Sequence, residues 1–116
     1  DEYFTNSRLE REKMYSQMLE TYQKILESST ISEEQKAISQ NEIAKIQNTK
    51  NSIMIAENLI KNKGIDNVII FVNDYSISVI VDAKQLGEAE IAQIQNIVVR
   101  EIKKKIEDIH VSKIKE

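Results

Sequence analysis

Cysteine, proline and tryptophan are absent from the 116-residue sequence, which has only two glycines and one histidine. Without cysteine, disulfides, thiolate metal sites and cysteine nucleophiles are excluded. The lone histidine, His110, rules out a zinc site built from several histidines of one chain. No run approaches the roughly 18 to 20 apolar residues of a membrane span. The scarcity of Pro and Gly indicates regular secondary structure with short connections, within the length of one domain.

The charge balance argues against a polyanion partner. There are 16 basic and 19 acidic residues, for a net charge of −3. A general nucleic-acid binder carries a concentrated basic excess. A KH-like nucleic-acid module is disfavoured further because the sequence has no GXXG loop. We therefore expect no nucleic-acid partner.

The first half of the chain has the composition of helices. Residues 1–62 contain no Gly or Pro and are rich in Glu, Lys, Gln and Asn. Helical spacing predicts an apolar stripe on the first helix at Met14, Met18, Tyr22 and Ile25. Ser32 to Gln35 fits a capping box, so a second helix should begin near Glu33. It should end before Gly64, the residue type that most easily adopts the left-handed conformation.

The second half alternates in the manner of strands. Residues 68–72 are a continuous apolar run. In residues 75–81, Ser76 and Ser78 alternate with apolar residues, as in a strand with one face buried. The intervening Asn73-Asp74 predicts a two-residue type I′ turn, with Val72 opposite Tyr75. Helical spacing returns over residues 88–105, and residues 108–114 form a short third strand. We expect one buried cluster that contains Ile70, Ile77, Val79, Ile94 and Val98.

This order of elements predicts an α+β fold. Two N-terminal helices precede a β-β-α-β core with a three-stranded sheet packed by helices on one face. The first strand is apolar on both faces, so we place it in the middle, which gives the strand order 2-1-3. We divide the chain into an N-terminal helix or stalk, residues 1–30, and an α-β-β-α-β domain, residues 31–116.

Groupings with catalytic potential are scarce. Glu88 and Glu90 are two positions apart on a predicted helix, so their side chains diverge. His110 has no serine in a nucleophile-elbow context to activate. No P-loop, dinucleotide-binding motif or cation-binding loop is present. The run Lys103–Lys105 suits a helix C-terminus. We predict no enzymatic activity, no cofactor and no metal.

The second face of the predicted sheet is unexpectedly apolar. Ile69, Phe71 and Ile80 would lie opposite the core, joined by His110 and Ile114 if the last strand turns Ile109 inward. Either the chain's own first helix or a partner should cover such a face. Open strand edges offer another route to assembly. The candidate partner or oligomer interface comprises Ile69, Phe71, Tyr75, Ile80, His110 and Ile114.

Five segments follow one another in a characteristic order: Asp1–Phe4 with Arg8–Lys13, Ser32–Lys36, Glu57–Ile65, Ile77–Val81, and Glu88–Ala92 through Val98–Glu101. In these segments and their order the sequence resembles the extracytoplasmic part of the SpoIIIAH family, stage III sporulation protein AH of endospore-forming bacteria. The resemblance covers nearly the whole chain.

The resemblance implies a ring-building fold like that of type III secretion ring components. It implies a non-enzymatic subunit of a sporulation channel that oligomerises into a ring and binds the LytM-like extracytoplasmic domain of SpoIIQ. The resemblance further implies that the chain projects into the intermembrane space between mother cell and forespore, anchored in the mother-cell membrane by an N-terminal helix not in this sequence.

A cytosolic helical adaptor or scaffold module with an α/β cap is the alternative. Because residue 1 is Asp rather than Met, we expect a shortened or processed chain that an anchor or signal segment could precede. About 20 apolar residues shortly upstream of Asp1 would favour the membrane-anchored interpretation, and a polar upstream segment would favour the adaptor.

Overall fold

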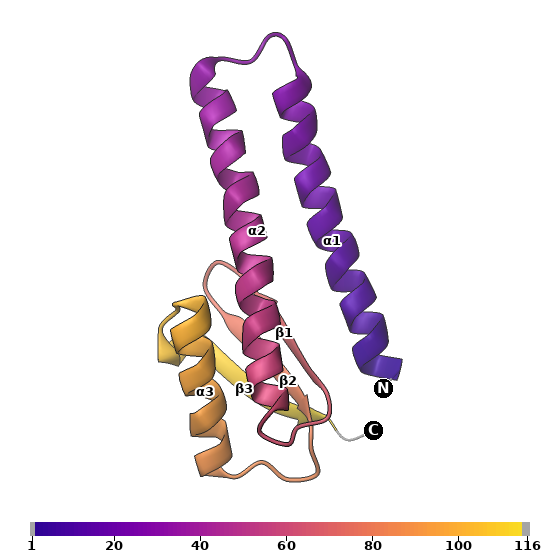
Figure 1. Cartoon of the computed structure of the whole chain (residues 1–116), viewed down its shortest axis with the longest axis vertical. Helices are drawn as coiled ribbons and strands as arrows, with labels where there is room; N and C mark the ends of the chain where they lie inside the picture. The colour runs from indigo at the N-terminus through magenta and orange to yellow at the C-terminus, as the bar shows by residue number, and fades with distance from the viewer. Residues whose placement is uncertain (1, 115–116) are drawn as a thin grey trace.

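A long helical hairpin stands on a small α/β core (Figure 1). The computed structural model describes residues 2–114. Helices α1 (Glu2–Glu27) and α2 (Glu33–Lys61) run side by side in opposite directions, and the sheet and α3 lie at one end of the hairpin. The longest dimension is 55 Å. The predicted α+β class is confirmed.

The ends of α2 lie where the sequence predicts them. The Ser32 hydroxyl accepts a hydrogen bond from the Gln35 amide at 3.1 Å, and the Gln35 side chain accepts one from the Ser32 amide at 3.2 Å. This capping box satisfies two amides that the first turn leaves without helical partners. At the other end Gly64 has φ 95°, the left-handed conformation that lets the chain leave the helix.

The inward face of α1 differs from the predicted stripe. Met14 and Met18 are exposed, whereas the neighbouring positions Tyr15 and Leu19 lie in or against the core. The stripe is wrong at Met14 and Met18, but Tyr22 and Ile25 are half-buried as predicted, and Tyr22 packs against the core. Helix α1 contacts both α2 and the first strand. The first helix thus folds back along the domain. The division of the chain at residue 30 stays a prediction.

The predicted strand order 2-1-3 is wrong. Strands β1 (Val68–Val72), β2 (Ile77–Asp82) and β3 (Ile109–Ile114) form a three-stranded sheet in the order β1-β2-β3, so β2 is central. β2 pairs with β1 antiparallel and with β3 parallel. Strand β1 is apolar on both faces although it lies at the edge, because helices α1 and α2 both contact it.

The turn between β1 and β2 is longer than the predicted Asn73-Asp74 type I′ turn. Val72 pairs with Ile77, and the Asn73 amide donates to the Ser76 carbonyl at 2.8 Å. The predicted pairing of Val72 with Tyr75 is therefore wrong by two residues. A shift of two preserves which side chains share a face, since the side-chain period of a strand is two. The assignment of Ile70, Ile77 and Val79 to the core face is confirmed, whereas Tyr75, expected on the same face, is exposed.

That core face packs beneath α2 and α3 (Glu88–Ile102). All five predicted core residues, Ile70, Ile77, Val79, Ile94 and Val98, are buried in one cluster. Helix α3 ends three residues earlier than predicted because Lys103 adopts the left-handed conformation, with φ 60°. The remaining lysines lead into a short 3-10 helix, η1 (Ile106–Asp108), which enters β3.

Candidate interaction surface

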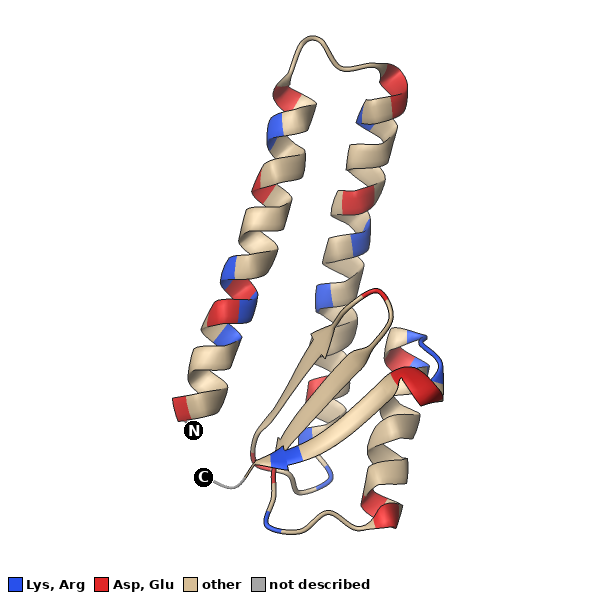
Figure 2. Cartoon of the chain, turned by 180° about the vertical axis from the view of Figure 1, so that it is seen from behind, with Lys and Arg blue, Asp and Glu red and all other residues tan. Residues whose placement is uncertain are grey.

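The sheet has one face turned away from α2 and α3, and no helix crosses it in Figure 2. The strand pairings arrange its side chains in rows. Phe71, Ser78 and His110 form one row across the three strands, and Ile69, Ile80 and Ser112 form the next. Asp82 and Ile114 pair beyond them. We call this set the open sheet face.

The open sheet face brings together five of the six predicted interface residues: Ile69, Phe71, Ile80, His110 and Ile114. Its exposure is uneven. His110 and Ser112 are exposed, whereas Phe71, Ile80 and Ile114 are half-buried. The sixth residue, Tyr75, is not on a strand. It lies in the β1–β2 turn and is 88% exposed.

One corner of the open sheet face is covered by the chain itself. Ile69 is fully buried but lies outside the main core cluster, as does Phe4 of α1. Arg8, one turn further along α1, donates to the Asn67 side chain at 3.3 Å, immediately before β1. Because α2 packs on the opposite face, α1 is the helix that covers Ile69. The rest of the face has no cover among residues 2–114.

The open sheet face carries little charge. Asp82 and Lys113 are the only Asp, Glu, Lys or Arg residues of the three strands, and Lys113 pairs with Val81, whose side chain lies on the core face. Two half-buried apolar side chains, Phe71 and Ile80, lie beside the hydroxyls of Ser78 and Ser112. Such a mixture of apolar and hydrogen-bonding groups suits contact with another protein surface.

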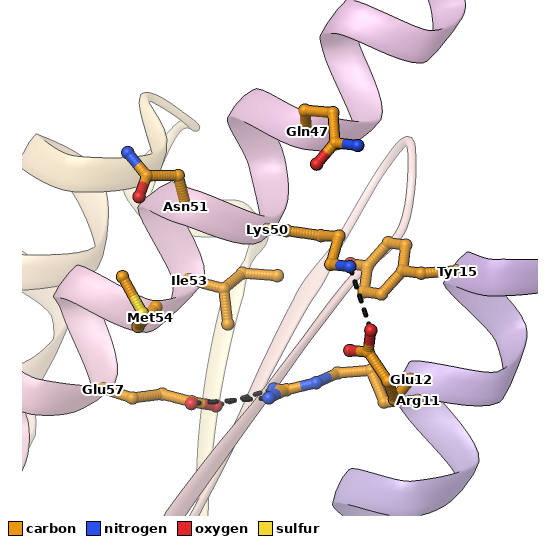
Figure 3. A pocket seen from close by; sticks show the side chains of 9 residues that line it. All are labelled: Arg11, Glu12, Tyr15, Gln47, Lys50, Asn51, Ile53, Met54 and Glu57. Atoms are coloured by element: carbon orange, nitrogen blue, oxygen red, sulfur yellow. Dashed lines mark hydrogen bonds and ion pairs between the residues drawn. The ribbon is translucent and has the colours of Figure 1, made fainter. Parts of the chain in front are cut away.

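A second feature lies between α1 and α2, in a cleft of about 360 Å³ (Figure 3). Arg11 of α1 and Glu57 of α2 form an ion pair at 2.6 Å, with side chains only 14% and 13% exposed. Both also bond the backbone of β1: Arg11 donates to the Ile70 carbonyl at 2.8 Å, and the Glu57 carboxylate accepts from the Ile70 amide at 2.9 Å. No local motif in the sequence predicts this pair, because its two residues lie 46 positions apart.

The other two charged groups in the cleft are also paired. Lys50 forms an ion pair with Glu12 at 3.0 Å, and its ammonium lies 5.9 Å from the centre of the Tyr15 ring. The charged groups of both pairs are thus used to hold α1 against α2. Within residues 2–114, no group of three or more histidine and acidic side chains could hold a metal ion. No helix in that range is long and apolar enough to cross a bilayer.

Titration of Tyr15 should report the packing of α1. Burial raises the pKa of its phenol above the ordinary value of about 10, Arg11 lowers that pKa, and Glu57 and Glu12 raise it. Above pH 10 the unfolded chain loses this proton first, so stability falls as the pH rises through the pKa of the folded state. Ultraviolet titration should show a tyrosine component that ionises above the ordinary pKa, and Tyr15→Phe should remove that component. A titration curve that loses no late component in Tyr15→Phe would contradict the prediction.

These observations define an α+β domain in which a helical hairpin lies along one edge of a small mixed sheet, one face of which is open. The model of the SpoIIIAH-like protein family matches residues 1–111, and the chain belongs to this family. The resemblance inferred from the sequence is confirmed.

One solved structure shares the fold over its whole length. It is described as the structure of the SpoIIQ-SpoIIIAH pore forming complex. The matching chain has a TM-score of 0.90 and 22% sequence identity, and the alignment covers 100% of each chain. Among curated proteins none is significantly similar in sequence.

Proposed function

We propose that this chain is a non-enzymatic subunit of a sporulation channel complex that links mother cell and forespore. Membership of the SpoIIIAH-like family over residues 1–111 carries the proposal. It is supported by the shared fold with a chain of a complex described as SpoIIQ-SpoIIIAH and pore forming. The partner proposed here is accordingly a SpoIIQ-like protein with a LytM-type extracytoplasmic domain.

The same proposal includes assembly and location. The subunit oligomerises into a ring in the intermembrane space, held at the mother-cell membrane by a segment outside this sequence. The proposed ring-building domain is residues 31–116. The helix that precedes it packs against α2 and β1 of that domain.

The open sheet face is the proposed contact surface. Phe71, Ile80, His110 and Ile114 supply its exposed and half-buried positions, and Tyr75 in the adjacent turn extends it. Ile69 contributes from beneath α1 by supporting the face. Burial of such partly exposed apolar side chains contributes about 25 cal/mol per Å² of apolar area removed from water.

Phe71→Glu is expected to weaken binding to the SpoIIQ extracytoplasmic domain by more than about tenfold, because it buries a charge in an apolar contact. The monomer should stay folded, since Phe71 is only half-buried. Binding is measured by light scattering of the mixed proteins and by pull-down, and folding by circular dichroism.

Ile38→Glu is the matched control. Ile38 is 53% exposed and lies on α2, away from the sheet. The Ile38→Glu variant should bind the SpoIIQ extracytoplasmic domain as tightly as the unaltered chain does. If Phe71→Glu is folded and binds as well as the control, the open sheet face is not the interface. If the unaltered chain does not bind the SpoIIQ extracytoplasmic domain, the proposed partner is wrong.

A further inference from the structure

The outer edge of β1 presents backbone groups that an additional strand could pair with. In an antiparallel pair, alternate residues direct their N–H and C=O groups toward the partner strand. The Asn67 carbonyl accepts from the Asp82 amide and the Asn73 amide donates to Ser76, so the odd-numbered residues face β2. Val68, Ile70 and Val72 therefore direct their backbone groups outward, away from the sheet.

At the centre of this edge, side chains take the place of a strand. The Ile70 carbonyl accepts a hydrogen bond from Arg11 at 2.8 Å, and the Ile70 amide donates one to the Glu57 carboxylate at 2.9 Å. A residue of a neighbouring strand would supply the same two bonds. The two side chains are bonded to each other at 2.6 Å and are largely shielded from water, which strengthens all three contacts.

The sequence of β1 explains why such closure is needed. Val68–Val72 reads Val-Ile-Ile-Phe-Val, with no charge, no Gly and no Pro. Paired antiparallel with a second copy about Ile70, it would set Val68 against Val72 and Ile69 against Phe71. Short, uncharged segments of high β-propensity at a sheet edge are the kind that associate edge to edge.

We propose that Arg11 and Glu57 act as a surrogate strand that closes the β1 edge against pairing with β1 of a second copy. Release of α1 removes the donor, leaves Glu57 without its counter-charge and uncovers Ile69 on the same strand. The contact is thus self-inhibitory: α1 in its docked position excludes strand pairing at β1. While α1 is docked, a further strand can add only at β3, the opposite edge strand of the sheet.

The test compares two methionine variants at positions on the α1–α2 interface. Arg11→Met removes the bonds to Ile70 and Glu57 while retaining much of the side-chain volume. Lys50→Met is the matched control, because it breaks the ion pair with Glu12 between the same helices without a contact to β1. Sedimentation velocity over a concentration series should show self-association of Arg11→Met at least about tenfold stronger than that of the unaltered chain and of Lys50→Met.

A second substitution identifies the edge. The Val72 amide points outward, so proline there removes a donor from the edge without removing a bond to β2. Arg11→Met combined with Val72→Pro should return to the association of the unaltered chain. An Arg11→Met variant that remains as monomeric as Lys50→Met overturns the proposal. So does association that Val72→Pro leaves unchanged.

Circular dichroism accompanies each measurement. If Arg11→Met is unfolded, Arg11→Gln takes its place, because the shorter uncharged side chain loses the ion pair with less loss of polar contact. It is held to the same comparison with Lys50→Met and to the same reversal by Val72→Pro.

Discussion

Replacing Ile70 with alanine is expected to lower the free energy of unfolding by about 2–4 kcal/mol. Ile70 is fully buried at the centre of the cluster that joins the sheet to α2 and α3. The shorter side chain removes apolar contacts and leaves a cavity that a close-packed core refills only in part. The backbone bonds of Ile70 to Arg11 and Glu57 should persist, so the loss reports packing. Urea denaturation followed by circular dichroism measures it.

Ile38→Ala is the control for the same chemical change at an exposed site. Ile38 is on α2 and is 53% exposed, so its truncation should change the free energy of unfolding by no more than about 0.5 kcal/mol. Unfolding of Ile70→Ala at the same urea concentration as the unaltered protein would mean that this side chain does not face the core.

Removal of the Glu57 carboxylate should have an effect of similar size. Glu57→Ala leaves the Arg11 guanidinium shielded from water without its counter-charge and leaves the Ile70 amide without its acceptor. The free energy of unfolding should fall by about 2–4 kcal/mol, because both groups stay shielded from water and lose the carboxylate that pairs with them. Denaturation in urea at constant pH and salt gives the value.

Glu12→Ala provides the comparison for an exposed ion pair across the same two helices. The Glu12 side chain is 61% exposed and pairs with Lys50. Its loss should cost less than about 1 kcal/mol, because solvent screens the pair. Equal losses for the two variants would show that the contact with the β1 backbone adds nothing to the ion pair.

Local signals in the sequence were enough to predict the ends of α2. The Ser32 cap and Gly64 each act within a few residues, so their geometry depends little on the rest of the fold. The face assignment in β1 and β2 also followed from the sequence. The face assignment is correct although the predicted turn is wrong. The partner of Val72 is Ile77 and not Tyr75, a shift of two residues, and a shift by an even number leaves each side chain on the same face.

The strand order depended on information that the sequence pattern does not contain. Two-sided apolarity of residues 68–72 has two causes: a central place in the sheet, or an edge covered by another element. The second holds here, because α1 packs beside β1 and covers Ile69. Periodicity alone does not distinguish these cases. The same limit explains why the contact of Arg11 with Glu57 was missed, since the two residues are 46 positions apart.

Five of the six residues of the candidate interface share one sheet face as predicted, and their role as an interface stays a prediction. Alternation placed Phe71, Ile80 and His110 on one face, and the pairings of β2 with both neighbours bring them together. Tyr75 was assigned to a strand because Asn73-Asp74 was taken as the complete turn. The longer turn releases Tyr75 from the sheet and exposes it.

The antiparallel hairpin also determines where the chain starts relative to its sheet. Helix α1 begins at the end of the molecule that holds the sheet, and the connection between the helices, residues 28–32, lies at the opposite end (Figure 1). Any segment joined ahead of residue 2 therefore meets the molecule close to β1. Lengthening both helices together would move the 28–32 connection outward and leave the separation between residue 2 and the sheet unchanged. The distance from the sheet to the 28–32 connection can therefore change without changing the distance from the sheet to the start of α1.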